Sequence, residues 1–171
     1  MEFTQLIEKR RSIRKYTSEA ISEDNIKKIV RAGLLAPSSR NLKSAEFIVI
    51  KDKEILKKLK GVKSAGSGFL DQAAFAVAVI GDSEKADAWI EDCSLALIYM
   101  QLAATELGIG SCWIQCRLRQ SSIENVSSEQ YAREVLGFAD NYRLEAIMSF
   151  GMPDEEKEPC TKIDEDKIHI I

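Results

Sequence analysis

Histidine, proline and tryptophan are scarce in this chain of 171 residues, which has one histidine, His169, three prolines and two tryptophans. The four cysteines are Cys93, Cys112, Cys116 and Cys160, and no two of them form a C-x-x-C pair. Zinc sites need cysteine and histidine at short repeated spacings, so we expect no metal site. Because Cys93 and Cys112 lie in apolar segments, we interpret them as small hydrophobic residues in a reducing compartment.

Long apolar runs are also missing. No uncharged apolar stretch reaches the roughly 18 residues that a membrane span requires. Charged residues precede any long apolar run at the N-terminus, which is not the pattern of a signal peptide. The net charge of −3 gives no reason to expect nucleic-acid or membrane binding. These absences predict a cytoplasmic protein that binds neither membranes nor nucleic acids.

The composition that remains, 45% hydrophobic and 30% charged, is that of an ordinary globular domain. The length suits one domain, residues 1–171, since single domains commonly hold roughly 100–200 residues. Hydrophobic periodicity predicts strands at 45–50, 73–81, 111–116 and 144–151. It predicts helices at 3–10, from Ser22 to before Pro37, at 52–60 and at 92–107, and helical turns at 120–137. The connections are unequal, so we expect the α+β class, with a mixed, mainly antiparallel sheet flanked by helices.

The predicted helix 92–107, DCSLALIYMQLAATEL, is apolar nearly all round. Such a pattern is typical of a helix that is enclosed on every side. Gly108 stands where a left-handed residue commonly ends a helix. A domain of this size rarely wraps one helix completely, so a second subunit is a natural candidate for the missing wall.

Three segments carry polar groups that suit a ligand. Guanidinium forks and a hydroxyl at Arg10, Arg11, Ser12 and Arg14 suit a phosphate, although short basic runs are more often solvated edges or address signals. The loop 36–41, APSSRN, offers hydroxyls and an amide, but the same composition is usual in turns. The third segment, 108–116, has glycines before an apolar strand and no following helix, which excludes a Rossmann dinucleotide loop.

In their order and spacing these segments resemble the nitroreductase family. The resemblance rests on Arg10-Arg11-Ser12-Ile13-Arg14, on Ala36-Pro37-Ser38-Ser39-Arg40-Asn41, on Trp89 and Asp92 followed by Leu107-Gly108-Ile109-Gly110-Ser111-Cys112-Trp113, and on Phe150-Gly151-Met152-Pro153. It covers essentially the whole chain. It implies an intertwined α+β homodimer that binds FMN between subunits, with the tail 152–171 reaching the partner.

The resemblance also implies a role for each motif. Arg10, Arg11, Ser12 and Arg14 would hold the phosphate, the ribityl chain and the pyrimidine edge of FMN. Pro37, Ser38, Ser39 and Asn41 would come from the other subunit. Trp113, Ile114, Gln115 and Cys116 would line the isoalloxazine ring, with a backbone N–H near flavin N5, and the Cys116 side chain is expected to pack rather than react. In the tail, Lys162 matches one of two basic phosphate ligands, Cys160 stands at the other, and Lys157 is an alternative.

No Ser-His, Cys-His or paired-carboxylate arrangement offers acid–base or nucleophilic catalysis, so we expect no catalytic side chain. That absence fits a flavoenzyme, in which the cofactor performs the chemistry. The resemblance implies a ping-pong oxidoreductase that takes electrons from NADH or NADPH and reduces a small acceptor such as a nitroaromatic or a quinone. The alternative is a flavin-binding or storage module without meaningful turnover, which the unusual Lys43-Ser44-Ala45 stretch keeps open.

Overall fold

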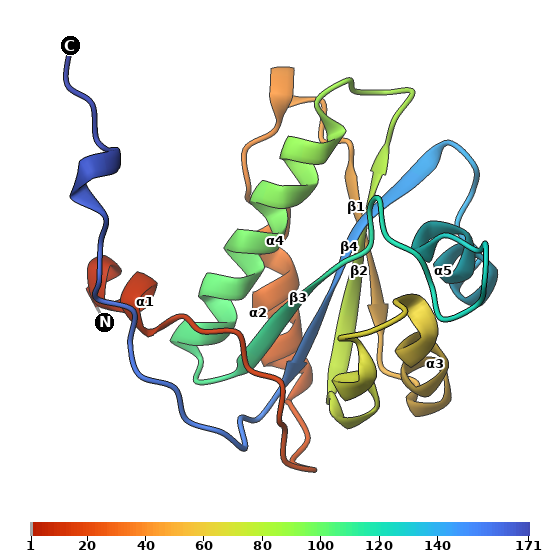
Figure 1. Ribbon diagram of the computed structural model, residues 1–171, viewed down its shortest axis with the longest axis horizontal. Coiled ribbons are helices and arrows are strands. Elements are labelled where there is room, and N and C mark those ends of the chain that lie inside the picture. Colours follow the sequence, from red (N-terminus) through yellow and green to blue (C-terminus); the bar gives the residue numbers. More distant parts are fainter. Residues whose placement is uncertain (1) are drawn as a thin grey trace.

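A computed structural model describes residues 2–171 and places four strands in one sheet (Figure 1). The strands are β1 (Ala45–Ile50), β2 (Phe75–Asp82), β3 (Gly110–Gln115) and β4 (Tyr142–Gly151), in the order β1-β2-β4-β3. The α+β class is confirmed. The prediction of a mixed sheet is wrong, because each pair of neighbouring strands is antiparallel. A helix joins β2 to β3, which run in the same direction, but β4 lies between them.

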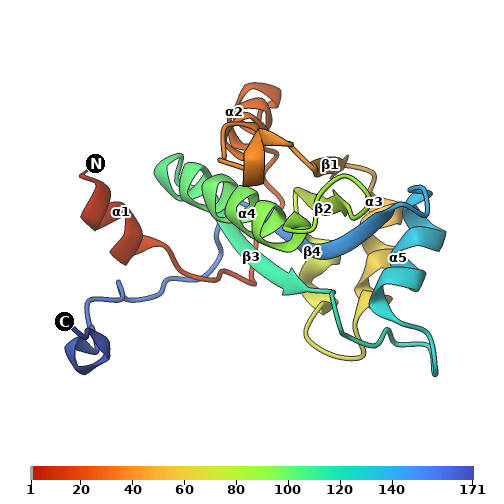
Figure 2. The ribbon, with the colours of Figure 1, turned by 90° about the horizontal axis from the view of Figure 1, so that it is seen from above.

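Five α-helices cover the sheet and its edge: α1 (Phe3–Lys9), α2 (Glu23–Leu34), α3 (Lys53–Lys58), α4 (Trp89–Glu106) and α5 (Ser128–Leu136). Helices α2 and α4 lie on one face of the sheet, and α3 and α5 lie on the other (Figure 2). Short 3-10 turns complete the chain at Ser39–Asn41, Leu59–Val62, Gly68–Gln72 and Glu165–Lys167.

Each face of the sheet has its own hydrophobic core. On the α4 face, the rings of Phe75 and Phe150 stack with centroids 4.6 Å apart, and Ile29 and Leu97 pack around them. On the α5 face, a second cluster contains Leu56, Leu59, Leu70, Leu144 and Ile147. Strand β2 is buried along nearly its whole length, as its continuous apolar run predicted.

Two helix ends confirm the sequence predictions, and two other details of the helices differ from them. Ser22 caps α2 by accepting the Asn25 N–H, and Gly108 has φ 73° after α4, so both predictions are confirmed. Leu34, predicted on the buried stripe of α2, is instead 63% exposed because the helix ends there. Residues 120–127 form a loop rather than helical turns, since the capping box between Ser127 and Gln130 starts α5 at Ser128.

Helix α4 is enclosed on one side only. Leu97 and Met100 are buried against the sheet, whereas Leu95, Ile98 and Tyr99 are each 41% exposed. With the half-buried Leu102, the exposed side chains have the i, i+3, i+4, i+7 spacing of one helix face. We call Leu95, Ile98, Tyr99 and Leu102 the α4 stripe. The full enclosure that the sequence predicts is therefore not provided by one chain.

The two ends of the chain run together beside the C-terminal end of α4. Residues 153–160 lie along the N-terminal segment of the same chain, with Asp154 N–H donating to the Lys15 carbonyl and Cys160 N–H to the Glu8 carbonyl. Residues 161–171 extend away from the sheet (Figure 1). A groove of about 720 Å³ separates α1 and the tail from the end of α4. That the tail reaches a partner subunit stays a prediction.

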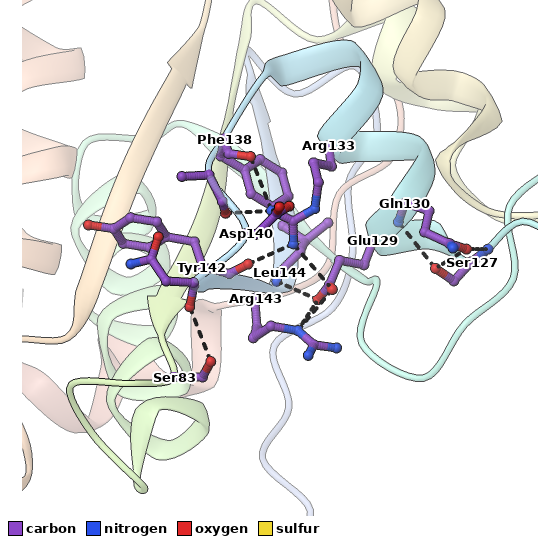
Figure 3. A network of polar contacts seen from close by, with 12 residues as sticks. Ser83, Ser127, Glu129, Gln130, Arg133, Phe138, Asp140, Tyr142, Arg143 and Leu144 are labelled. Atoms are coloured by element: carbon purple, nitrogen blue, oxygen red, sulfur yellow. Dashed lines mark hydrogen bonds and ion pairs between the residues drawn. The ribbon is translucent and has the colours of Figure 1, made fainter.

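The turn between α5 and β4 is organised around Arg133 (Figure 3). Its guanidinium donates to the carbonyl oxygens of Phe138 at 3.1 Å and Tyr142 at 2.7 Å, and also to that of Ala139. The same group lies 4.4 Å from the centroid of the Phe138 ring. Glu129 completes the network, because its carboxylate contacts Arg133 and accepts the Leu144 N–H at 2.9 Å. These contacts hold the start of β4 against α5.

Candidate functional site

The basic segment 10–14 is attached to the start of β3. Ser12 forms a parallel bridge with Ser111, and the Ile13 N–H donates to the Ser111 carbonyl at 2.9 Å. The bend that follows is held by Tyr16, whose hydroxyl donates to the Ile13 carbonyl at 2.7 Å. Gly151 makes this possible, because a Cβ there would lie 2.6 Å from the Tyr16 ring. Burial raises the pKa of Tyr16, so its hydroxyl stays neutral and serves as a fixed hydrogen-bonding group.

Tail residues complete this region from the other side. Lys157 Nζ donates to the Ser12 carbonyl at 2.5 Å, and Glu155 Oε1 accepts the Arg14 N–H at 2.5 Å. The hydrogen bond from the Arg14 backbone lowers the pKa of Glu155. Lys157 is thus the tail lysine beside the basic segment, whereas Lys162 is exposed and has no hydrogen bond or ion pair with any residue from 2 to 171.

The four polar residues of segment 10–14 do not act as one group. Arg11 turns towards the tail and donates to the Glu158 carbonyl. The Arg10 and Arg14 side chains make no hydrogen bond or ion pair within the described residues, so their charged donors are unused. Three neighbours lie close to the Cys112 thiol: Ser12, Arg14 and Lys157. Each of them lowers the pKa of this thiol, although burial raises it overall. The start of β3 therefore has two free guanidinium groups, which suit a phosphate, beside the ion pair of Lys157 with Glu155.

The loop 36–44 is attached to the opposite end of α4. Buried Asp92, in the first turn of α4, accepts the Ser39 N–H and the Ser44 hydroxyl, each at 2.7 Å. Arg40, Asn41 and Lys43 have positive φ values of 51°, 56° and 51°. Each such residue is strained in the left-handed region, at a cost of about 1 kcal/mol or more. The contacts with Asp92 therefore hold a loop conformation that the local sequence disfavours.

Strand β3 exposes a backbone edge between these two places. The Cys116 N–H donates to the Glu145 carbonyl of β4 at 3.2 Å. Hydrogen bonds of an antiparallel pair alternate, so the N–H groups of Trp113 and Gln115 point away from β4, towards the free edge of the sheet. On the α4 face, the Trp113 indole N–H donates to the Gln115 side-chain oxygen at 2.8 Å. A donor at this edge can pair with a flat ligand that lies along the strand.

Three of the four cysteines are packing residues. Cys93, Cys112 and Cys116 are buried, and Cys160 is exposed in the tail. Burial raises the pKa of Cys116 to about 12, so its thiol is neutral at physiological pH and unsuited to redox exchange. In the described part of the chain, no three histidine, cysteine or acidic side chains are grouped so that they could bind a metal ion. Residues 2–171 likewise contain no helix with the length and hydropathy needed to cross a bilayer.

One chain does not bring the predicted site residues together. Segment 10–14 and β3 meet at the C-terminal end of α4, and the loop with Pro37, Ser38, Ser39 and Asn41 meets its N-terminal end (Figure 1). The 16 residue steps from Asp92 to Gly108 along the helix span roughly 24 Å. The two groups therefore lie at opposite ends of one helix.

Comparison with known proteins identifies the family. The family model described as "Nitroreductase family" matches residues 7–66 and 61–152. The chain belongs to the nitroreductase family. An FMN-dependent nitroreductase from Clostridium difficile R20291 has a similar structure, with a TM-score of 0.95, 44% identity and 98% of each chain covered.

Two further nitroreductase relatives are known by sequence. A protein of Archaeoglobus fulgidus, named as a candidate NADH dehydrogenase/NAD(P)H nitroreductase, is 36% identical over 98% of this chain and 97% of its own. An NAD(P)H-dependent FMN reductase of Bacillus subtilis is 34% identical over 82 residues, 48% of this chain and 32% of its own. The chain is thus an oxidoreductase of this family by descent.

Two buried carboxylates are not among the site residues that the sequence predicts. Asp92 belongs to the W-x-x-D pattern, but its hold on the loop 36–44 depends on a contact across 53 positions. Glu145 lies in the predicted strand LEAIMSFG, where an acidic residue inside an otherwise apolar strand is itself a signal. Both are buried, at 3% and 4% exposure.

Replacing Asp92 with alanine is expected to loosen the loop 36–44 while the fold is retained. Both acceptor oxygens are lost, so the Ser39 N–H and the Ser44 hydroxyl lose their partner, which costs about 1–3 kcal/mol for each buried donor. Hydrogen exchange of the Ser39 amide should then accelerate by roughly 10- to 100-fold, since its protection depends on this contact. Asp87→Ala is the matched control, because Asp87 is 83% exposed in its ion pair with Arg40. Unchanged exchange in Asp92→Ala would contradict the assignment.

Proposed function

We propose that the protein is an FMN-dependent NAD(P)H oxidoreductase whose active unit is a homodimer. Two polar half-sites, segment 10–14 with β3 and the loop 36–41, lie at opposite ends of α4, and the exposed α4 stripe lies between them. This separation is the observation that carries the proposal. A two-fold contact uses the same surface of both subunits. If two copies pack through the stripe with their α4 helices antiparallel, the segment 10–14 of one copy comes beside the loop 36–41 of the other.

The residues present fit FMN. The unused guanidinium groups of Arg10 and Arg14, with the Ser12 hydroxyl and the nearby Lys157, offer charge-assisted donors to a phosphate. The outward N–H of Gln115 at the free edge of β3 is a donor for the acceptor atom N5 of a flavin ring. The partner's loop would contribute Pro37, Ser38, Ser39 and Asn41 to the other side of the ring.

Bound FMN supplies hydride and electron transfer between a nicotinamide and an acceptor. The protein's part is to position it: charged side chains hold the phosphate, the β3 edge directs the ring, and the α4 stripe excludes water where two subunits meet. We infer a ping-pong sequence in which NADH or NADPH binds and leaves before an electron-poor acceptor, such as a nitroaromatic or a quinone, binds in the same place. The names of the relatives from Clostridium difficile, Archaeoglobus fulgidus and Bacillus subtilis support FMN and NAD(P)H.

Purified protein is expected to be yellow and to contain one FMN per chain, because each chain supplies one phosphate half-site and one loop half-site. Extraction and chromatography of the pigment measure the content and distinguish FMN from FAD. Anaerobic addition of NADH or NADPH should bleach the flavin rapidly. A yellow protein that neither nucleotide bleaches would support a flavin-storage module instead, and a colourless protein that cannot be reconstituted with FMN would exclude both functions.

Replacing Arg14 with alanine should weaken FMN binding by at least roughly tenfold, since a charge-assisted hydrogen bond contributes about 1.5–3 kcal/mol. Fluorescence titration of the apoprotein with FMN measures the dissociation constant. Arg143→Ala is the matched control, because Arg143 lies near the opposite end of β4 from Gly151 and its side chain is 52% exposed. Equal affinities of the two variants would show that the phosphate binds elsewhere.

The dimer prediction concerns the α4 stripe. Ile98→Glu places a charge on a side chain that is 41% exposed in one chain, so the monomer should fold while the apolar contact is lost. Light scattering is expected to show a monomer, and FMN affinity should fall with it because the half-sites separate. Lys57→Glu, on α3 at the other face of the sheet, should leave the dimer intact. A monomeric Ile98→Glu variant that binds FMN as tightly as the unaltered protein would refute the shared site.

A further inference from the structure

Glu145 is an acidic side chain inside the apolar strand β4. It is 4% exposed, and its neighbours Leu144 and Ala146 are fully buried. Its Oε1 accepts the side-chain N–H of Gln115 at 3.2 Å. Its Oε2 is buried and has no hydrogen-bond partner among the described residues. Since an unsatisfied buried carboxyl oxygen is costly, a role in the site explains its presence better than packing does.

The backbone of Glu145 also shapes the strand beside it. The register between β2 and β4 shifts at Val79 and Ile80, which pair with Ala146 and Leu144, so Glu145 is the extra residue of a β-bulge. Its carbonyl accepts two N–H groups, from Cys116 at 3.2 Å and from Arg117 at 3.0 Å. Strand β3 therefore leaves the sheet at Glu145, directly after the outward N–H of Gln115.

The side chains form a chain of hydrogen bonds that fixes the Gln115 amide. Its oxygen accepts the Trp113 indole N–H at 2.8 Å. Its nitrogen donates to the Glu145 carboxyl at 3.2 Å and also lies 3.4 Å from the carbonyl oxygens of Glu145 and Arg117. Turning the amide over would break both contacts at once, because a donor would then face the indole and an acceptor would face the carboxyl. Trp113 and Gln115 are the two β3 residues whose backbone N–H groups face the free edge.

Glu145 lies among both charged and neutral groups. Burial raises its pKa, and the Gln115 hydrogen bond and the charge of Arg117 lower it in part. Glu91, on the first turn of α4, raises it further. Cys93 on α4 and Cys116 after β3 also lie in its field, and burial raises the pKa of both thiols, so they are neutral at physiological pH. The two thiols therefore stay neutral where the carboxyl group of Glu145 gains or loses its proton.

We propose that Glu145 is a positioning residue that clamps the free edge of β3 through Gln115 and Trp113, and that gain or loss of its proton tightens or loosens this clamp. The ionised carboxylate makes a charge-assisted hydrogen bond with Gln115, which is roughly twice as strong as the bond made by the neutral acid. The consequence of this clamp for a bound flavin rests on the proposed function. The clamp itself is a property of the chain without ligand.

The first test uses the apoprotein and the Trp113 indole as the reporter. With Trp89→Phe, Trp113 is the one remaining tryptophan, because the chain has two. Its emission should change with pH, with a midpoint above the usual glutamate pKa of about 4.3. Adding Glu145→Gln should abolish this transition, because the amide carries no titrating proton. A transition that persists in Glu145→Gln, or that is absent when Glu145 is present, would overturn the clamp.

A second variant guards against a general loss of folding. Glu91→Gln removes a like charge that raises the pKa of Glu145, so the Trp113 transition should remain and its midpoint should move to lower pH. Glu91 is exposed, so the fold should tolerate this change. A midpoint that stays in place, with a normal unfolding curve, would show that another group controls the indole.

The flavin-loaded protein gives the third measurement. At a pH above the midpoint of the Trp113 transition, Glu145→Gln removes a negative charge close to the β3 edge, so the midpoint potential of the flavin should become more positive. An unchanged potential would overturn the part of the inference that concerns the flavin. A chain that binds no FMN would instead overturn the proposed function, and the Trp113 titration would still decide whether Glu145 acts as the clamp.

Discussion

Helix α4 lies across the antiparallel sheet with one apolar side buried and the other side only partly covered, and the rest of the arrangement depends on that asymmetry. The buried side, with Leu97 and Met100, attaches the helix to β2 and β4. Its first turn carries Asp92, which holds the loop 36–44, and its last turn leads through Gly108 into β3. The helix thus sets both the distance between the two half-sites and the surface through which a second copy can join them.

Buried polar side chains position the segments at both ends of α4. Asp92 compensates for a loop with three residues in the left-handed region, and Tyr16 holds the bend that attaches segment 10–14 to β3. Both contacts join elements far apart in sequence, so they are formed only when the sheet and α4 have packed. The groups that would touch a ligand, in contrast, have no partner within the chain: the guanidinium groups of the half-buried Arg10 and the exposed Arg14, and the N–H of Gln115 at the edge of the sheet. A rigid buried frame with unused donors at its rim is what a preorganised binding site requires.

Insertion of β4 between β2 and β3 accounts for several features together. It makes the sheet antiparallel, it leaves β3 as an edge strand, and it brings the bulge at Glu145 beside Gln115. The acidic residue in β4 and the free edge of β3 therefore belong to one structural arrangement.

The amino-acid sequence by itself determined what depends on local chemistry. Periodicity located the four strands and most helices, Ser22 and Gly108 marked helix ends, and the ordered motifs from Arg10 to Pro153 indicated the family. Tertiary structure alone decided which strands are neighbours, because the position of β4 depends on packing on both faces rather than on its own residues. It also decided that Lys157 rather than Lys162 lies beside Ser12, that Arg11 turns away to the tail, and that Glu145 meets Gln115. Each of these is a contact between distant segments, whose geometry no local pattern encodes.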